Sequence, residues 1–165
     1  MSIAHAAYAS PMGTLHLYAR DNCIIRLDFA QSAEAARWFD NYFTKERAEE
    51  GSPPVIAALA RELDEYFAGR RTVFTVPYRL YGTEYRQSVW RALAGIPYGE
   101  AITYGELARR VGTPKAARAV GGANHHNPIS IVVPCHRVVG ADGGLTGYGG
   151  GIERKAFLLK LENAR

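Results

Sequence analysis

Cys135, His136 and Arg137 are the consecutive residues of this 165-residue chain that are best suited to covalent chemistry. A cysteine reacts as its thiolate, and a neighbouring imidazole or guanidinium favours that form. The thiolate is also the strongest intrinsic nucleophile among the side chains. The pattern therefore predicts a nucleophilic cysteine at position 135. The alternative is that Cys135 is a small hydrophobic residue of the core, which is the commoner role of a lone cysteine on an apolar segment.

The segment before this cysteine is expected to hold it at the end of a rigid element. Residues 129–133 read I-S-I-V-V, a mostly β-branched run that is too short for a buried helix and typical of a buried strand. Pro134 cannot continue a central ladder, so the strand is predicted to stop there. We therefore expect Cys135 to follow directly after a buried strand.

Two short helices upstream of the cysteine form a helix-turn-helix pattern. The first begins at a capping box, Thr103 and Glu106, and the second is predicted over about 114–123. On the second helix Lys115 and Arg118 share a face at a spacing of three, among small residues that allow close approach to another surface. This arrangement favours nucleic-acid binding, and the alternative is an αα-hairpin packed in a core.

The first half of the chain predicts a small α+β domain over residues 1–76. Its sequence shows no group of residues whose types and spacing suit catalysis. Its predicted elements are strands over 3–8, 14–20, 23–29 and 73–76, and helices that begin at Ser32 and at Pro53–Pro54. Residues 77–82 are predicted to be a linker, and residues 83–165 a second, mostly helical domain that opens on a helix capped by Thr83.

Charge is distributed unevenly between the two halves. Residues 1–79 carry a net charge of −1 and residues 80–165 a net charge of +5, which together give the +4 of the chain. Basic charge in one half suggests a polyanionic partner for that half, and a solvated basic face is the alternative. No apolar run approaches the length of a membrane span, and no signal peptide is recognisable. With two cysteines and no export signal, a reducing cytoplasm is the expected compartment.

A glycine-rich segment follows the cysteine. Residues 141–151 contain one aromatic residue, Tyr148, and lack the ending of a phosphate-binding loop. The composition suits a backbone that comes close to a flat ligand on which Tyr148 stacks, or else a flexible hairpin. A last amphipathic helix is predicted over 152–161, with Glu162 at its end.

Taken together, these motifs resemble the O6-alkylguanine-DNA alkyltransferases. The resemblance rests on P-C-H-R-V at 134–138, I-P-Y-G-E-x-x-T-Y-G-E-L-A at 96–108, P-K-A-A-R-A-V-G-G-A-N at 114–124, N-P-I-S-I-V-V at 127–133 and L-T-G-Y-G-G-G at 145–151. It implies an α/β (α+β) protein with a ribonuclease H-like N-terminal domain, built on a three-stranded antiparallel sheet with helices. It also implies a C-terminal winged helix-turn-helix domain.

The resemblance further implies DNA repair by a single irreversible transfer. The alkyl group of O6-alkylguanine, or of O4-alkylthymine, passes to Cys135, which stays alkylated. His136 takes the thiol proton through a water, Glu162 holds the imidazole, and Asn127 ties the turn around the site together. No cofactor and no metal is implied, and His5, His16 and Cys23 fit no zinc-ligand spacing.

The implied partner is double-stranded DNA that contains alkylated guanine, bound by a monomer, with cooperative binding as an open possibility. The helix enters the minor groove and the damaged nucleotide is flipped out. Arg118 fills the gap in the stack, Tyr104 presses on the adjacent phosphate, and Lys115 adds positive charge. The base pocket is implied to use the Val138 carbonyl, the Tyr148 ring and backbone amides near Gly149 and Gly150.

Three positions differ from well-known members of that family, and three other functions stay open. Gly105 and Ala141 stand where polar groups can contact the DNA backbone, and Ser130 replaces a proline beside the pocket. The alternatives are a lesion-binding protein that transfers nothing, a transcription regulator, and a cysteine–histidine hydrolase. The thiol counts against the first, and a helix rich in alanine and glycine offers little for reading the major groove.

Overall fold

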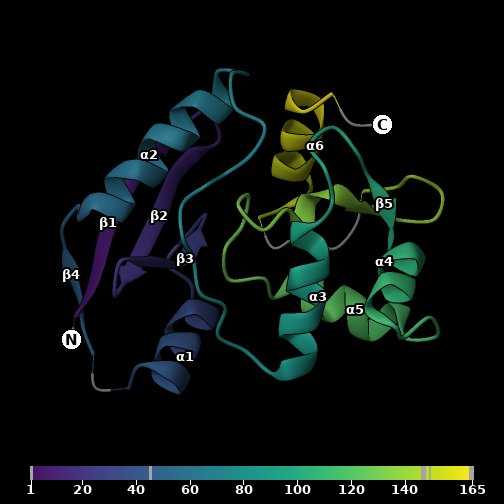
Figure 1. Ribbon diagram of the computed structural model, residues 1–165, viewed down its shortest axis with the longest axis horizontal. Helices are drawn as coiled ribbons and strands as arrows, with labels where there is room; N and C mark the ends of the chain where they lie inside the picture. The colour runs from purple at the N-terminus through teal and green to yellow at the C-terminus, as the bar shows by residue number, and fades with distance from the viewer. Residues whose placement is uncertain (1, 45, 146–147, 149, 164–165) are drawn as a thin grey trace. The chain divides into compact units, whose positions relative to one another are not determined.

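The computed structural model describes residues 2–44, 46–145, 148 and 150–163 (Figure 1). The chain divides into two compact units, Met1–Tyr81 and Gly82–Arg165. The first unit holds a sheet and two helices, and the second is mostly helical, so the predicted α+β class is confirmed. None of the described helices has the length and apolar character needed to cross a membrane.

A four-stranded sheet forms the centre of the first unit. Its strands are β1 (Ile3–Ser10), β2 (Gly13–Arg20), β3 (Cys23–Asp28) and β4 (Ala48–Glu50), in the order β3-β2-β1-β4. The first three make the predicted antiparallel meander, because apolar residues such as Leu15 and Leu17 alternate toward the core. Strand β4 is an exposed edge strand that pairs parallel with β1. The sequence does not predict β4, because none of its three residues is buried.

Two helices complete the first unit. Helix α1 (Ala33–Tyr42) begins as predicted at Ser32, whose hydroxyl accepts a hydrogen bond from the Ala35 N–H at 3.1 Å. Helix α2 (Pro54–Phe67) has its proline at the first helical position and packs against β1, β2 and β3 (Figure 1). Both helices thus begin where their capping signals predict.

The predicted strand over 73–76 is wrong. Glu62 of α2 is buried, and its carboxylate accepts hydrogen bonds from the backbone N–H of Thr75 at 2.8 Å and from the Thr75 hydroxyl at 2.5 Å. A helix side chain therefore satisfies backbone groups that a neighbouring strand would otherwise bind. The segment stays irregular, although its residues favour a strand.

Helices dominate the second unit. They are α3 (Glu84–Ala94), α4 (Tyr104–Val111), α5 (Ala117–His125) and α6 (Ile152–Leu161). Thr83 and Thr103 cap α3 and α4 as predicted, through hydrogen bonds from the N–H groups of Arg86 and Glu106. Helices α3, α4 and α5 pack together (Figure 1). Trp90 of α3 is buried, and its indole N–H donates to the Ala123 carbonyl of α5 at 2.8 Å.

Helix α5 begins three residues later than the sequence predicts. Thr113 and Pro114 belong to a turn closed by a hydrogen bond from the Ala116 N–H to the Thr113 carbonyl at 2.9 Å. Lys115 therefore precedes the helix, and the prediction that it shares a helical face with Arg118 is wrong. Both side chains are nevertheless exposed.

A two-stranded parallel ladder joins distant parts of the second unit. Strand β5 (Ile102–Thr103) pairs with β6 (Val138–Val139), with Ile102 opposite Val138 and Thr103 opposite Val139. Strand β5 leads directly into α4, and β6 directly follows the Cys135 segment. The ladder therefore ties the start of the helix-turn-helix to the segment that carries the thiol.

Candidate active site

The segment before Cys135 is a compact turn, and the predicted buried strand over 129–133 is wrong. The buried side chain of Asn127 replaces the missing neighbouring strand. Its Nδ2 donates to the Val133 carbonyl at 2.7 Å, and its Oδ1 accepts from the Ile129 N–H at 3.1 Å. The Val133 N–H donates back to the Ile129 carbonyl at 3.0 Å. One amide side chain thus satisfies both ends of the turn.

Two very tight turns lie in this segment, between Ser130 and Cys135. Ile131 has a φ of 72°, and the Val132 N–H donates to the Ser130 carbonyl at 2.8 Å across it. Pro134 has φ −81° and ψ 66°, and the Cys135 N–H donates to the Val133 carbonyl at 2.8 Å. Both are γ-turns, and a β-branched residue at positive φ costs about 1–3 kcal/mol. The hydrogen bonds of Asn127 hold this strained geometry in place.

Cys135 begins a single 3-10 turn, η1 (Cys135–Arg137), and its side chain is buried. Burial raises the pKa of the thiol to about 11, because it disfavours the thiolate. A hydrogen bond from the Asn127 side chain and the positive charge of Lys155 act in the opposite direction. The resting sulfur is therefore a protonated thiol at neutral pH, and any reaction as a nucleophile would need a base to remove its proton.

His136, the next residue in the chain, is a candidate for that base. Its ring is fully buried, and its Nε2 lies 2.8 Å from Oε2 of Glu162. A carboxylate can only accept, so Nε2 carries the proton and Nδ1 presents a lone pair. Within the described part of the chain Nδ1 has no hydrogen-bond partner. Burial lowers the pKa of His136, and the Glu162 carboxylate partly offsets that effect, so the imidazole is neutral and ready to accept a proton.

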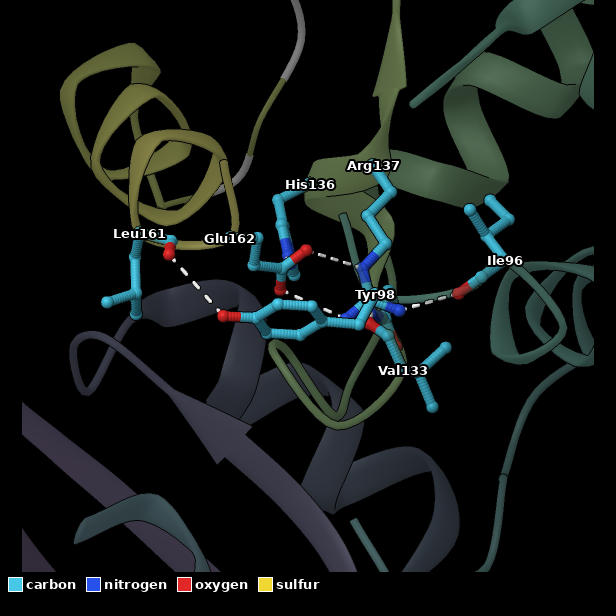
Figure 2. Close-up of polar contacts among 8 residues, drawn as sticks. Ile96, Tyr98, Val133, His136, Arg137, Leu161 and Glu162 are labelled. Atoms are coloured by element: carbon cyan, nitrogen blue, oxygen red, sulfur yellow. Dashed lines mark hydrogen bonds and ion pairs between the residues drawn. The ribbon is translucent and has the colours of Figure 1, made fainter. Parts of the chain in front are cut away.

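Arg137 has a role that the sequence does not predict. Its guanidinium turns to Glu162, with Nε 2.8 Å from Oε1 and Nη2 3.0 Å from Oε2, and its Nη1 donates to the Ile96 carbonyl. Figure 2 shows Arg137 reaching Glu162 on one side and Ile96 on the other. Both charged groups are almost fully buried. Arg137 thus fixes the carboxylate that orients His136, in the two-pronged geometry that favours arginine over lysine.

Lys155 of α6 is a second residue that the sequence analysis misses. Its side chain is fully buried, and its Nζ lies 5.7 Å from the centre of the Tyr104 ring. Burial lowers the pKa of Lys155 to about 8, and its interaction with Cys135 acts to raise it. A signal exists in the sequence, because Lys155 precedes the buried residues Leu158 and Leu159 by three and four positions and so shares their helical face.

The predicted base pocket is described in part. Val138 is buried in β6, three residues after Cys135. Tyr148 is also buried, which raises the pKa of its hydroxyl well above the ordinary value. The Gly150 carbonyl accepts from Nη1 of Arg154 at 3.1 Å. Gly149 lies outside the described residues.

The residues predicted to bind DNA lie on the helix-turn-helix. Tyr104 is the first residue of α4 and is half-buried, while Arg118 lies in the first turn of α5 and is exposed. No hydrogen bond links Arg118 or Lys115 to the thiol segment among the described contacts. Their assignment to DNA therefore stays a prediction.

In the described ranges, no three histidine, cysteine or acidic side chains gather as a metal ion would require. His5 and His16 contact each other through Nε2 and Nδ1 at 2.9 Å, and Glu50 is the other partner of His5. Cys23 is half-buried in β3.

Comparison with known proteins identifies the family. Residues 3–80 match the ribonuclease-like domain of 6-O-methylguanine DNA methyltransferase, and residues 84–164 match its DNA binding domain. A methylated-DNA–protein-cysteine methyltransferase of Mycolicibacterium paratuberculosis is 48% identical over 163 residues, which cover 97% of this chain and 92% of that protein. The constitutive enzyme of that name from Bacillus subtilis is 44% identical over 154 residues, 93% of this chain and 91% of its own.

Solved structures agree with this assignment. The Mycobacterium tuberculosis O6-methylguanine methyltransferase has a TM-score of 0.84 and 46% identity, and the match covers 98% of this chain and 93% of that one. The structure of Mycobacterium tuberculosis OGT in complex with DNA has a TM-score of 0.83 and 44% identity, with 99% and 93% covered. This chain therefore belongs to the 6-O-methylguanine DNA methyltransferase family, as its motifs predict.

Proposed function

We propose that this protein repairs O6-alkylguanine in DNA by moving the alkyl group irreversibly to the sulfur of Cys135. The observation that carries the proposal is a buried thiol directly followed by a neutral histidine, whose Nε2 is held by Glu162 and whose Nδ1 is open. The curated relatives are named methylated-DNA–protein-cysteine methyltransferase, which is the same reaction. Each molecule acts once, because a thioether offers no route back to the thiol.

The proposed reaction is a displacement at the alkyl carbon. The thiol proton passes to Nδ1 of His136, the sulfur–carbon bond forms, and the bond between the carbon and guanine O6 breaks. The electron pair stays with guanine, which takes a proton and is restored. The imidazolium that forms is stabilised by the Glu162 carboxylate at 2.8 Å. Since Nδ1 has no partner among the described residues, we infer that a water carries the proton from the sulfur to the ring.

We further propose that DNA binds along the helix-turn-helix. The alkyl carbon of a paired base is out of reach in a duplex, so the nucleotide must be flipped out. Arg118, exposed on α5, is proposed to occupy the gap, with Tyr104 and Lys115 at the neighbouring phosphates. The net charge of +5 on residues 80–165 supports a polyanionic partner. Mycobacterium tuberculosis OGT, at 44% identity, has been crystallised with DNA.

The flipped base is proposed to enter between Val138 and Tyr148, with backbone amides near Gly149 and Gly150 as donors to the leaving guanine. Support comes from the burial of Val138 and Tyr148 and from the interaction between Tyr148 and Cys135. A monomer in the cytoplasm stays the prediction from the sequence.

The direct test is a stoichiometry measurement. Purified protein is incubated with increasing amounts of duplex DNA that contains O6-methylguanine, and the protein is then digested and analysed by mass spectrometry. We expect at most one methyl group per chain, on the peptide that contains Cys135. Binding to the lesion without any adduct would identify a lesion-binding protein, and loss of many lesions per chain without an adduct would identify a different enzyme.

Arg118→Ala is expected to lower the repair rate on duplex DNA by about 10- to 100-fold, because the vacated position in the stack is left unfilled. Reaction with the free alkylated base O6-benzylguanine should change by less than about twofold, since no flipping is needed. Both rates are measured by single-turnover kinetics. Arg61→Ala, which removes the same charge from the exposed surface of α2, is the control and should leave both rates unchanged. Equal losses on duplex and free base would contradict a flipping role for Arg118.

The transfer rate is expected to be nearly constant around pH 7, below the pKa of about 8 at which Lys155 loses the charge that favours the thiolate. The lowered pKa of His136 keeps the base neutral throughout this range, and the pKa of Cys135 near 11 keeps its proton available for transfer. The rate should fall at more acidic pH, as His136 becomes protonated. Single-turnover rates on methylated duplex DNA at constant ionic strength provide the measurement. A tenfold rise per pH unit across the range would show instead that a pre-formed thiolate reacts without the base.

A further inference from the structure

Two buried asparagines flank the thiol segment, and they differ in one respect. Asn127 has both ends of its amide satisfied, as described above. Asn124, near the end of α5, is also buried, and its Nδ2 donates to the Cys135 carbonyl at 3.3 Å. Its Oδ1 has no hydrogen-bond partner within the described part of the chain. The proposed mechanism makes no use of this oxygen.

The orientation of the Asn124 amide is fixed. Rotating the amide would place Oδ1 against the Cys135 carbonyl, where two acceptors repel, so the donor must face that carbonyl. The adjacent Ala123 carbonyl is held by the indole N–H of Trp90 at 2.8 Å, which fixes the helix at this point. Oδ1 therefore lies within about 6 Å of the Cys135 carbonyl oxygen, the hydrogen bond plus the width of the amide group.

An unpaired buried carbonyl oxygen is costly, and native proteins seldom keep one without a ligand or a water. This oxygen is on the helix assigned to DNA, and the nitrogen of the same amide binds the carbonyl of Cys135, the residue assigned to attack the base. A hydrogen-bond donor on the bound base would satisfy it. On O6-alkylguanine the ring nitrogens N1, N3 and N7 are acceptors, and the 2-amino group is the one donor of the base. O4-alkylthymine offers an acceptor at its O2 and no donor.

We propose that Asn124 determines base specificity by accepting a hydrogen bond from the 2-amino group of the flipped guanine. This inference rests on the proposed function, because it requires an alkylated base in the site beside Cys135. It makes guanine lesions the preferred substrates. Alkylated bases without the 2-amino group, including O4-alkylthymine, react more slowly because the Asn124 oxygen is left unpaired in their complexes.

The test compares two lesions that differ in the 2-amino group alone. Duplexes with O6-methylguanine or O6-methylhypoxanthine opposite cytosine are repaired by the wild type and by Asn124→Leu, which is close in volume and offers no acceptor. Single-turnover rates give a selectivity ratio for each protein. Comparing the two ratios cancels differences in how easily each base is flipped, as in a double-mutant cycle. Thermal unfolding of each variant is recorded alongside.

We expect the wild type to have the higher ratio and Asn124→Leu to lower it by about 5- to 50-fold, with most of the loss on O6-methylguanine. An equal loss on both lesions would show that Asn124 only supports the Cys135 carbonyl and would overturn the proposal. Should Asn124→Leu fail to fold, Asn124→Ala removes the same acceptor with a smaller side chain and should lower the ratio in the same way; a ratio equal to that of the wild type would overturn the proposal as well. No transfer to the wild type from either lesion would instead refute the proposed function.

Discussion

Replacing Cys135 by serine is expected to abolish alkyl transfer, with a loss on the order of 10⁴-fold or more. An alcohol is much less acidic than a thiol and its oxygen is a weaker nucleophile toward alkyl carbon. The thiol is already difficult to ionise, because burial raises its pKa to about 11, and a hydroxyl in the same buried position is harder still to activate. Transfer is measured as radioactive methyl retained by the protein after incubation with labelled duplex DNA. Binding of the same duplex should be nearly unchanged.

Cys23→Ser is the matched control for this substitution. Cys23 is the other free cysteine, half-buried in β3 of the first unit. The same change of sulfur to oxygen there should leave the transferred methyl at one equivalent per chain. Methyl retained by the Cys135→Ser protein, or lost from the Cys23→Ser protein, would show that position 135 is not the acceptor.

Glu162→Gln is expected to lower the free energy of unfolding by about 3–5 kcal/mol. The Glu162 carboxylate is fully buried and is the partner of two prongs of Arg137 and of the Nε2 of His136. An amide of the same shape removes the negative charge and turns an NH₂ group toward the guanidinium, so a buried positive charge loses its partner. Urea unfolding followed by circular dichroism measures the change. Transfer should also fall by about 10²–10⁴-fold, because a neutral amide stabilises the imidazolium formed during transfer much less than the carboxylate does.

The control for this effect is Glu106→Gln. Glu106 also pairs with two arginines, Arg109 and Arg110, at 2.6 and 3.0 Å, but on the exposed surface of α4. Ion pairs in water contribute little to stability, so the urea midpoint should scarcely change. Equal changes in the two variants would mean that the Glu162 network acts as an ordinary surface ion pair, which its burial argues against.

The elements that the sequence predicts well are those set by local signals. Ser32, Thr83 and Thr103 each cap the helix that their spacing predicts, and strands β1 to β3 follow their alternating pattern. In these cases the residues that decide the structure are neighbours in the chain. The family motifs also predicted Cys135, His136 and Glu162 as one group, and the structure brings His136 and Glu162 into contact across 26 positions.

The errors share a different cause. A strand was predicted over 129–133 from its β-branched residues, but the Asn127 side chain binds the backbone that a strand would have offered to a neighbour. Glu62 does the same for Thr75. Arg137 and Lys155 were missed because a charged residue is ordinarily exposed, and only the fold reveals that these two are buried against partners. Long-range contacts of polar side chains are therefore what the sequence pattern leaves open.

The short ladder between β5 and β6 has a consequence for local unfolding. Two residue pairs alone connect the strand that enters α4 with the strand that leaves the thiol segment. So small a ladder has little stability by itself, and its amides exchange with solvent whenever either flank opens. Ile102 and Val138 should then show similar hydrogen-exchange protection, as members of one cooperative unit. An opening at the start of α4 would in that way also loosen the segment that carries Cys135.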